Sequence, residues 1–375
     1  MIKAFKVQLQ PNNKQRSLLF QCAGTARWAY NHALARQKQH FEETNGFISH
    51  RDIRKELTQL KRTDEFKWLY QYSNNITKQA IKDADTAFRN FFRKNARYPR
   101  FKSKRHTRPS FYHDPVKLKL TERHVQLEMT GKIRLREPGH IPLGVKYVNP
   151  RISFDGINWW ISVGVDVGDL TLDMPESAPV GVDLGVSSLA VVSDGRRFKN
   201  INKTRTIRQL EKKLRRLQRK ASRHYIKLQK GGSRSKRLNR LEREVRRTHL
   251  RLTNLRDNHL HQITSTLVKA KPEFIVIEDL NVSGMMKNRC LSEKIAKQKW
   301  HEFRRQLEYK CEWYGVALLA APRFLPSSKT CSSCGAIKND LRLSDRTFTC
   351  EDCGTVIDRD LNASINLIDY GRSIA

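Results

Sequence analysis

The spacing of apolar and polar positions changes along the chain and predicts regions of different structure. Residues 2–9 alternate apolar and polar side chains like an edge strand, whereas residues 12–43 and 51–61 have helical spacing. Residues 74–97 are also helical in pattern, with one apolar stripe surrounded by basic residues. This stripe consists of Ile76, Ala80, Ala84, Phe88 and Phe91 or Phe92. We interpret the stripe as part of a hydrophobic core.

Short alternating segments fill residues 110–165, separated by Gly and Pro. Examples are residues 116–120, 125–129 and 159–163. Segments of this length predict a small β-barrel. The strand at residues 2–9 is expected to join it, so that the helical region becomes an insertion into the barrel. Residues 169–178 then form a linker to the second half of the chain.

An acid is built into an apolar strand at residues 178–195. Val182 and Leu184 point to one face of this strand and Asp183 to the other. Gly185 permits a turn before a second strand at residues 189–192, so we expect a β-hairpin that presents one carboxylate. Asp183 could alternatively do no more than fix a local turn by accepting backbone hydrogen bonds.

Two later segments carry acids that could meet Asp183. Residues 274–279 form an apolar strand pattern that ends in Glu278, and a helix is predicted to begin within residues 358–363, which include Asp360. Glu278 could simply end a buried strand at the water interface. Three acids on elements suited to a mixed sheet favour a site in which the carboxylates converge on a divalent metal ion.

A basic helical hairpin is predicted at residues 203–268, with Gly231 and Gly232 between its arms. Its apolar residues have the spacing of a coiled-coil seam. They are Ile207, Leu210, Leu214 and Leu217 on one arm, and Leu238, Leu241, Val245, Leu252 and Leu255 on the other. Residues 203–256 contain 21 Lys and Arg against three Glu. A solvated basic face is the alternative, but such clustering favours contact with nucleic acid.

Composition supports the same partner. The 375 residues contain 73 Lys and Arg against 37 Asp and Glu, a formal net charge of +36, and a polyanion best relieves that self-repulsion. No run of 18 apolar residues is present, so we expect no membrane partner. Residues 1–6 lack the apolar core of a secretory signal. We therefore expect a cytoplasmic, nucleoid-associated protein.

Four of the seven cysteines form two Cys-x-x-Cys pairs. Cys331 and Cys334 are separated from Cys350 and Cys353 by 15 residues, and a glycine follows each pair. This is the spacing of a zinc ribbon, in which four thiolates form a closed tetrahedral site. The Zn²⁺ there organises structure and has no open coordination position for chemistry. Cys22, Cys290 and Cys311 lack such partners, and we expect them in the core.

The acids Asp183, Glu278 and Asp360 predict the opposite kind of site. Their hard oxygens suit Mg²⁺ or Mn²⁺, which keep open positions for water and phosphate oxygens. Two such ions would activate a water and stabilise the departing 3′ oxygen of a phosphodiester. Residues 97–105 interleave aromatic residues with cations, a composition that grips phosphates while stacking on bases. A solvated basic loop is the alternative there.

Taken in order, these motifs resemble TnpB, the transposon-encoded family of RNA-guided nucleases related to type V CRISPR effectors. The resemblance covers essentially the whole chain. It rests on residues 181–185 (Gly-Val-Asp-Leu-Gly), 277–282 (Ile-Glu-Asp-Leu-Asn-Val), the four-cysteine ribbon, and 358–364 (Asp-Arg-Asp-Leu-Asn-Ala-Ser), together with 98–102 and 327–331.

The resemblance implies a multidomain α+β and α/β fold with a RuvC-like, ribonuclease H-type nuclease domain. The implied domains are a β-barrel wedge domain (1–12 and 110–178), a helical recognition domain (13–109), the nuclease domain (179–325 and 356–375) and an inserted zinc ribbon (326–355). It also implies a prokaryotic source, a guide RNA from the transposon end and a double-stranded DNA target. We expect a monomer.

Carried over by the resemblance, the catalytic acids are Asp183, Glu278 and Asp360. Asp360 is preferred to Asp358 because the family's acid lies in the Arg-Asp-x-Asn part of the motif. The wedge and recognition domains of such proteins also read a short DNA motif beside the target. The candidate nucleic-acid contacts in this region are Asn75, Lys78, Gln79, Arg97, Tyr98, Arg100, Lys102, Ser110, Phe111 and Tyr112.

The leading interpretation is therefore an RNA-guided DNA endonuclease that hydrolyses phosphodiesters with divalent metal ions. In such a protein, base pairing with the guide supplies the sequence specificity. Three alternatives stay open: an RNA-guided repressor that has lost cutting, a transposase that joins DNA ends with the same carboxylates, and a zinc-ribbon RNA-binding factor without activity.

Overall fold

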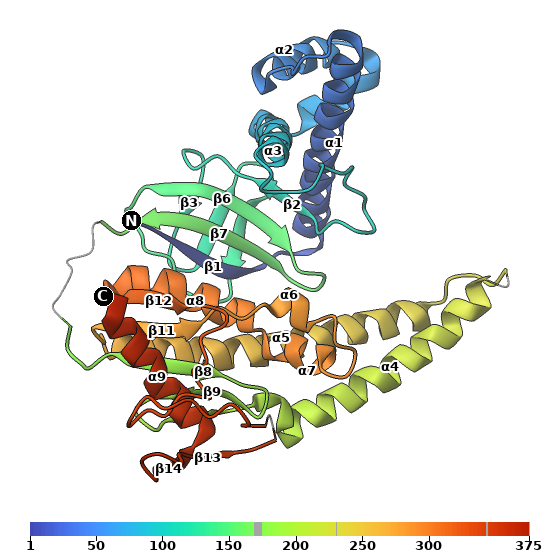
Figure 1. The fold of residues 1–375 in the computed structure, drawn as a ribbon. Coiled ribbons are helices and arrows are strands. Elements are labelled where there is room, and N and C mark those ends of the chain that lie inside the picture. Colours follow the sequence, from blue (N-terminus) through green and yellow to red (C-terminus); the bar gives the residue numbers. More distant parts are fainter. Residues whose placement is uncertain (169–174, 230, 343, 375) are drawn as a thin grey trace. The chain divides into compact units, whose positions relative to one another are not determined.

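The computed structural model describes residues 1–168, 175–229, 231–342 and 344–374 (Figure 1). The chain divides into two compact units, Met1–Asp169 and Leu170–Ala375. Residues 169–174 of the predicted linker lie outside the described residues. Within the described ranges, no helix has both the length and the apolar character needed to cross a membrane.

The first unit is built on one antiparallel seven-stranded sheet of order β2-β6-β7-β1-β5-β4-β3. Its strands are β1 (Ile2–Gln10), β2 (Ser110–Tyr112), β3 (Lys119–Leu120), β4 (His124–Leu127), β5 (Gly131–Leu135), β6 (Tyr147–Phe154) and β7 (Trp159–Asp166). The N-terminal strand joins the sheet as predicted. The prediction that it is an edge strand is wrong, because β1 pairs with β7 on one side and β5 on the other.

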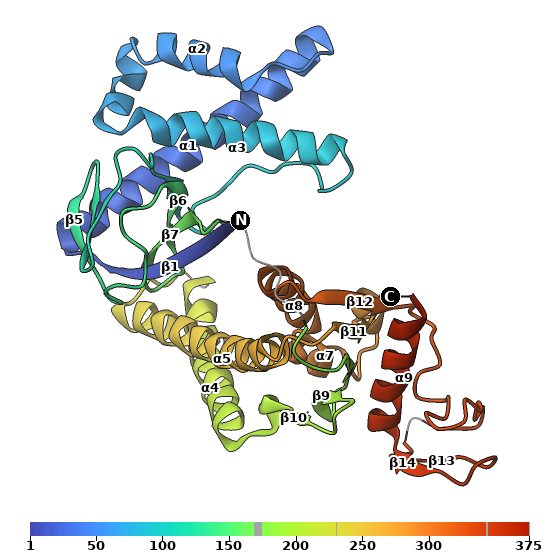
Figure 2. The same cartoon turned by 90° about the vertical axis from the view of Figure 1, so that its left-hand side faces the viewer.

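The helices of this unit are inserted between β1 and β2 (Figure 2). They are α1 (Asn13–Thr44), α2 (His50–Leu60), a 3-10 helix (Asp64–Gln71) and α3 (Asn74–Phe92). Asn12 caps α1 through a reciprocal capping box with Gln15. The α3 stripe is buried from Ile76 to Phe88 and shares one core with the sheet, whereas Phe92 is 61% exposed. Phe92 is therefore not a core residue, because α3 ends there.

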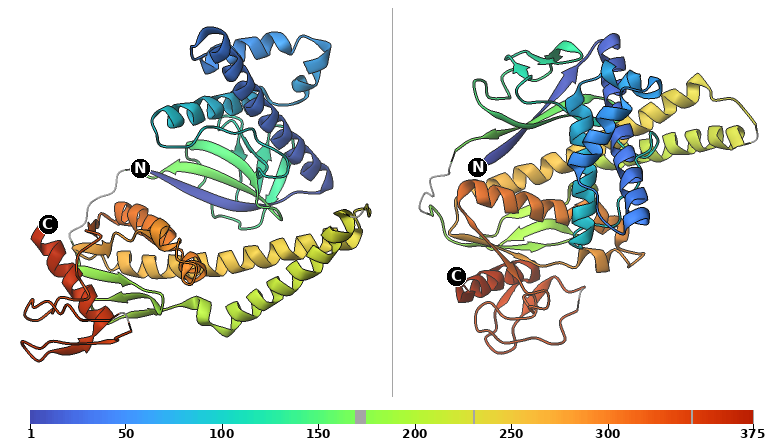
Figure 3. Two further views of the ribbon diagram at one scale, coloured as in Figure 1. Left: turned by 45° about the vertical axis from the view of Figure 1, so that its right-hand side comes forward. Right: turned by 90° about the horizontal axis from the view of Figure 1, so that it is seen from above.

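The second unit contains a mixed five-stranded sheet of order β10-β9-β8-β11-β12. The strands are β8 (Val180–Leu184), β9 (Ser188–Val192), β10 (Arg197–Lys199), β11 (Phe274–Glu278) and β12 (Ala317–Ala321). β8, β11 and β12 run parallel, while β9 and β10 are antiparallel to their neighbours. The helices α5 (Lys236–Lys269) and α8 (Trp300–Tyr314) cover one face, and α9 (Arg359–Ile374) covers the other (Figures 1 and 3).

The predicted basic hairpin is formed by α4 (Arg205–Gln229) and α5, which lie side by side in Figure 3. Its seam is confirmed: Ile207 and Leu214 of α4 pack with Leu252 of α5 in one cluster. A 3-10 helix (Ile201–Lys203) precedes the hairpin. Two short helices, α6 (Val282–Met285) and α7 (Ser292–Gln298), follow β11.

The four-cysteine region lies between β12 and α9 and contains the two-stranded sheet of β13 (Thr347–Thr349) and β14 (Val356–Asp358). Gly335 and Gly354, which follow the two cysteine pairs, both have positive φ, a conformation that glycine adopts without steric cost. Outside this region, Cys22 and Cys311 are buried as predicted. The prediction for Cys290 is wrong: it is exposed in the loop between α6 and α7, where no apolar layer covers it.

Candidate functional site

Strand periodicity decides which acids share a face of the second unit's sheet. In β11, Ile275 and Ile277 pack toward α5 and α8, whereas Phe274 and Val276 pack with Leu367 of α9. Glu278 has the parity of Phe274 and Val276, so its side chain belongs to the α9 face. In β8, Asp183 lies on that face by the same argument, because Val182 and Leu184 belong to the opposite core.

Register then brings the two acids together. β8 and β11 pair in parallel, with Val182 opposite Ile277. Asp183 and Glu278 are the next residues on their strands and therefore stand beside each other at the carboxyl ends of two parallel strands. This edge of a sheet is where open α/β folds bind their ligands.

The third acid reaches the same edge from α9. Asp360 lies in the first turn of this helix. Asp358 is occupied differently: its Oδ1 accepts from the backbone N–H groups of Asp360 and Leu361 at 3.0 Å each, and Arg197 forms an ion pair with it at 2.6 Å. Asp358 therefore caps the helix. This geometry supports the choice of Asp360 over Asp358 as the proposed catalytic acid.

A glycine in β8 permits α9 to approach the sheet. A Cβ atom on Gly181 would lie 1.9 Å from the backbone oxygen of Ser364. Gly371, near the C-terminal end of α9, also permits this close approach. A Cβ added to it would lie 2.5 Å from the ring of Phe274. The helix that carries Asp360 is thus in direct contact with the strand that carries Asp183.

The electrostatics of this edge reflect three neighbouring negative charges. Burial raises the pKa of Asp183 well above its usual value, and the charges of Glu278 and Asp360 add to the effect. Burial also raises the pKa of Glu278, despite a hydrogen bond at 3.0 Å from the hydroxyl of Ser327. Arg359 partly compensates Asp360 through an ion pair at 3.0 Å. Such mutual repulsion is what a bound cation would relieve.

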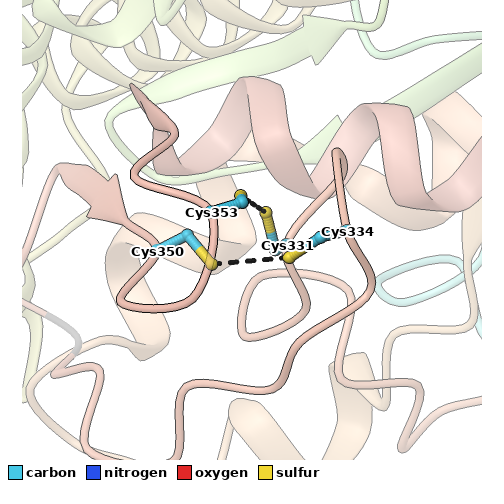
Figure 4. Close-up of side chains that lie close together, drawn as sticks. All are labelled: Cys331, Cys334, Cys350 and Cys353. Carbon is cyan, nitrogen blue, oxygen red and sulfur yellow. Dashed lines mark hydrogen bonds between the residues drawn. The ribbon is translucent and has the colours of Figure 1, made fainter.

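The four cysteine thiols form a second, separate cluster (Figure 4). All four sulfur atoms lie within 4.8 Å of one another, which holds for no other group of three or more metal-binding side chains among the described residues. The Sγ atoms of Cys331 and Cys353 are 3.7 Å apart, and those of Cys334 and Cys350 are 3.6 Å apart. Zn–S bonds of about 2.3 Å in a tetrahedron require sulfurs roughly 3.8 Å apart. The thiols therefore fit a zinc ion.

Hydrogen bonds connect the cysteine cluster to the acids. Asn362, fully buried on α9, contacts the backbone on both sides of Cys331: its Nδ2 donates to Thr330 O at 2.7 Å and its Oδ1 accepts from Ser332 N at 2.9 Å. Asn366, one turn further, donates to Ser327 O at 2.7 Å. Ser327 in turn donates to Glu278. The ribbon, α9 and β11 are thereby joined next to the acids.

The predicted nucleic-acid contacts all lie in the first unit, in different surroundings. Lys102, Ser110 and Tyr112 line one small cavity together with Arg151. Lys78 instead lines a wider cleft. The other cations of this cleft are Arg51, Arg54 and Lys55 of α2, and Lys61, which directly follows that helix. Phe111 is 5% exposed and its side chain belongs to the core.

The polar residues of α3 are already paired. Asn75 Nδ2 donates to Asp114 at 2.7 Å, and Gln79 Nε2 donates to Asp83 at 2.9 Å. Asp83 also receives two hydrogen bonds from Arg151, at 2.7 and 2.8 Å. These residues therefore link α3 to β6, the strand beside β2.

The segment after α3 presents its cations to solvent. Tyr98 packs its ring edgewise on Phe88 and Phe91 yet is 53% exposed. Arg97 and Arg100 are exposed. Lys102 is held instead, with its Nζ 3.5 Å from the centre of the Tyr30 ring.

Comparison with known proteins places the chain in a family. Three family models match: "Helix-turn-helix domain" at residues 1–46, "Probable transposase" at 162–289, and "Cas12f1-like, TNB domain" at 300–367. A "Putative RNA-guided DNA endonuclease" of Streptomyces pristinaespiralis is 33% identical over 98% of this chain and 89% of its own length. The protein InsQ of Escherichia coli K12, with the same description, is 33% identical over 100% of this chain and 93% of its own.

The chain belongs to the TnpB family. The family expected from the motifs is thus confirmed. The Cas12f1 chain of a solved Cas12f1–sgRNA–target DNA complex is 13% identical, with a TM-score of 0.63 over 98% of both chains. That likeness confirms the multidomain fold class.

The matched ranges of the TnpB chain contain all the residues of the two clusters. The range 162–289 includes Asp183 and Glu278, and the range 300–367 includes the four cysteines and Asp360. The range 1–46, described as helix-turn-helix, folds here as strand β1 followed by the single helix α1.

Sequence reasoning assigned no role to Ser327, Asn362 or Asn366 of this TnpB chain. Ser327 and Asn362 lie inside motifs that were quoted for the resemblance, and Asn366 lies two residues beyond one, but serine and asparagine have many local uses in turns and helices. The available signal for a role was that these residues lie close in the sequence to the cysteines or to Asp360. Only the fold shows that Asn366 contacts Ser327 and that Asn362 contacts Thr330 and Ser332.

Proposed function

We propose that the chain is an RNA-guided DNA endonuclease whose hydrolytic site is formed by Asp183, Glu278 and Asp360. The observation that carries this proposal is the register that sets Asp183 beside Glu278, with the charge of Asp360 near enough to raise the pKa of both, in a member of the TnpB family. Bound Mg²⁺ or Mn²⁺ would supply water activation and stabilise the leaving 3′ oxygen. Asp183, Glu278 and Asp360 would hold the ions.

Within this proposal, each acid is positioned by a different element. Asp183 and Glu278 are fixed by strands that are buried on both faces, and Ser327 orients the Glu278 carboxylate through its hydrogen bond. Asp360 is fixed by the capped first turn of α9. Sites on regular elements are held more accurately than sites on loops. The zinc ribbon adds a further support through Asn362.

The nucleic-acid partners proposed are a guide RNA and a double-stranded DNA target. The charge of +36 supports a polyanionic partner. The solved Cas12f1 relative in fold is bound to both kinds of nucleic acid. On α4, six cations (Lys212, Arg215, Arg216, Arg219, Lys220 and Arg223) line one groove, which suits a phosphate backbone. Base pairing would then supply sequence specificity.

The test is to co-express the chain with the transcript of its own downstream flank, purify the complex and sequence the bound RNA. A plasmid library with a target matching that RNA and a randomised flank is then incubated with and without Mg²⁺. We expect Mg²⁺-dependent depletion of plasmids that carry one short flanking motif. Asp183→Ala should abolish cutting while guide-directed DNA binding persists. Asp369→Ala, an exposed acid on the same helix α9, is the matched control and should cut normally.

Other outcomes would identify the alternatives. Bound RNA with specific DNA binding but no cutting by the unmodified protein would favour the repressor. Joined DNA ends in place of hydrolysed ends would favour the transposase. Full-rate cutting by Asp183→Ala would contradict the site assignment.

A further inference from the structure

The side chain of Phe324 lies almost entirely in water. It is 90% exposed, the highest value among the large hydrophobic side chains of the described residues. Single exposed apolar residues are common on protein surfaces. Phe324 differs from them in two respects: the backbone around it is fixed, and its neighbours contact the end of the strand that carries Glu278.

A tight turn sets the outward direction of the ring. The backbone N–H of Leu325 donates to Pro322 O at 3.0 Å, which closes a turn with Arg323 and Phe324 at its centre. Leu325 packs inward against the core formed around Phe274 and Val276. Pro322 and Pro326 restrict the backbone at either end. The ring is thus held in solvent by the fold.

Residues on either side of Phe324 contact the end of β11. On one side, Arg323 Nη2 donates to the carboxylate of Asp279 at 2.9 Å. On the other side, the Ser327 hydroxyl donates to Glu278 at 3.0 Å. Phe324 follows Arg323 directly and precedes Ser327 by three residues. Phe324 therefore lies in a segment that contacts the end of the strand that carries Glu278, one of the acids that we propose to be catalytic.

The adjoining surface is a cleft lined by both acidic and basic side chains. Arg323 lines a cleft of about 400 Å³ that also contains Glu278. His301, Arg304 and Arg305 of α8 line the same cleft, together with Asp279 and Glu308. Arg304 and Arg323 form ion pairs with Asp279, and Arg305 forms one with Glu302. An exposed aromatic ring is the stacking part of a single-strand binding site. In duplex DNA the bases stack on one another, so only an unpaired base could lie on this ring.

We propose that Phe324 is a substrate-positioning residue that stacks on an unpaired base of the DNA strand entering the acid site. The inference rests on the proposed nuclease function and adds a subsite to it, whose ligand is an unpaired nucleobase of single-stranded DNA. Stacking of this kind tolerates any base, which agrees with specificity that comes from pairing. It would hold the strand so that the next phosphate faces Asp183, Glu278 and Asp360.

The binding test uses the full chain with its guide RNA, in an Asp183→Ala background so that no cutting interferes. A short single-stranded DNA carrying 2-aminopurine is titrated, and its fluorescence reports stacking. The parent complex and Phe324→Trp should quench it, whereas Phe324→Ala and Phe324→Leu should not. We expect the affinity for this DNA to fall about five- to 150-fold in Phe324→Ala, the range that loss of one stacked base predicts.

A second measurement uses the cutting-competent protein. Single-turnover cleavage of a guide-matched plasmid should slow in Phe324→Ala and recover in Phe324→Trp, with guide binding and melting temperature unchanged. Ile337→Ala, which removes another exposed apolar side chain from the neighbouring ribbon, should have no effect.

The outcomes separate this inference from the proposed function. Quenching that is equal in Phe324→Ala and the parent, or retained in Phe324→Leu, would overturn stacking even if the protein cuts DNA. A fall in melting temperature or guide binding in Phe324→Ala that accounts for the slower cleavage would also overturn it. Ring-dependent quenching in a protein that cuts nothing would support the subsite while the nuclease proposal fails.

Discussion

The side-chain oxygen of Asn362 accepts a hydrogen bond from the backbone N–H of Ser332 at 2.9 Å. Asn362 is two residues after Asp360, and Ser332 directly follows the first cysteine of the cluster. The same amide donates to Thr330 on the other side of that cysteine. One fully buried side chain thus fixes the cysteine loop to the helix turn that carries a proposed catalytic acid.

We expect Asn362→Ala to weaken both the zinc site and cleavage. The substitution leaves the Ser332 N–H without its partner, at a cost of roughly 1–3 kcal/mol, whereas the Thr330 carbonyl still accepts from Asn366 Nδ2 at 2.6 Å. A chelator competition assay should show faster zinc release, and single-turnover cleavage should slow at saturating Mg²⁺. Asn239→Ala, at an exposed asparagine on α5, is the control. Unchanged zinc release with normal cleavage would show that the contact has no positioning role.

Loss of the zinc ion should also disturb the position of Asp360, because the hydrogen bonds of Asn362 connect the cysteine loop to α9. Structural zinc contributes directly to folding, so we expect Cys353→Ser to lower the zinc content below one ion per chain and to disorder the ribbon. Cleavage should fall even with excess Mg²⁺, while binding of guide RNA largely remains. The control is Cys290→Ser, because Cys290 is an exposed thiol outside the cluster. Elemental analysis and cleavage assays on both variants would check this, and zinc-free protein that cuts at full rate would contradict it.

Much of this site could be predicted because its signals are local. Two-residue periodicity places Asp183 on the other face of its strand from Val182 and Leu184. Cysteine spacing alone predicts the ribbon. The helix that carries Asp360 is predicted to begin within residues 358–363, and α9 begins at Arg359. None of these signals depends on which distant segment becomes a neighbour.

The errors and omissions depend on such neighbours. β1 is an interior strand because β5, more than a hundred residues later, pairs with its free side. Cys290 is exposed because its loop finds no apolar layer, which composition does not reveal. Asn362 and Ser327 act through backbone groups of other elements, and a hydrogen bond to backbone leaves no signature in the partner's side chain.

Gly181→Ala should separate α9 from β8. The added Cβ would lie 1.9 Å from the backbone oxygen of Ser364, so the helix or the strand must shift. Overpacking of this kind costs about 1–3 kcal/mol or more. We expect a lower melting temperature and a greater loss of cleavage, because Asp360 moves with the helix.

A second glycine provides the control for Gly181→Ala, with the opposite expected sign. Gly24 lies inside α1 with no atom within 4 Å of an added Cβ. Gly24→Ala should therefore stabilise the protein by about 0.5–1 kcal/mol and leave cleavage unchanged. Thermal melts and cleavage rates of both variants test the pair. A Gly181→Ala protein with normal stability and activity would show that α9 can be displaced without consequence for the acids.

The raised pKa of Asp183 predicts that the acid site costs stability in the absence of its cation. Burial and the charges of Glu278 and Asp360 disfavour the carboxylate form in the folded protein. Since the folded pKa lies above the unfolded value of about 3.9, the stability that this group contributes at low pH is lost as the pH rises through the folded pKa. Each pKa unit of that difference corresponds to about 1.4 kcal/mol.

Asp183→Asn removes this charge, so we expect the metal-free variant to melt at a higher temperature than the parent at pH 8, with a smaller difference at pH 5. Mg²⁺ should raise the melting temperature of the parent more than that of the variant, because the ion relieves a repulsion that the variant lacks. Asp369→Asn, at an exposed position of α9, should show neither effect. Melts at both pH values, with and without Mg²⁺, decide the matter: a variant less stable than the parent at pH 8 would mean that Asp183 is held by structural hydrogen bonds and not poised to bind a cation.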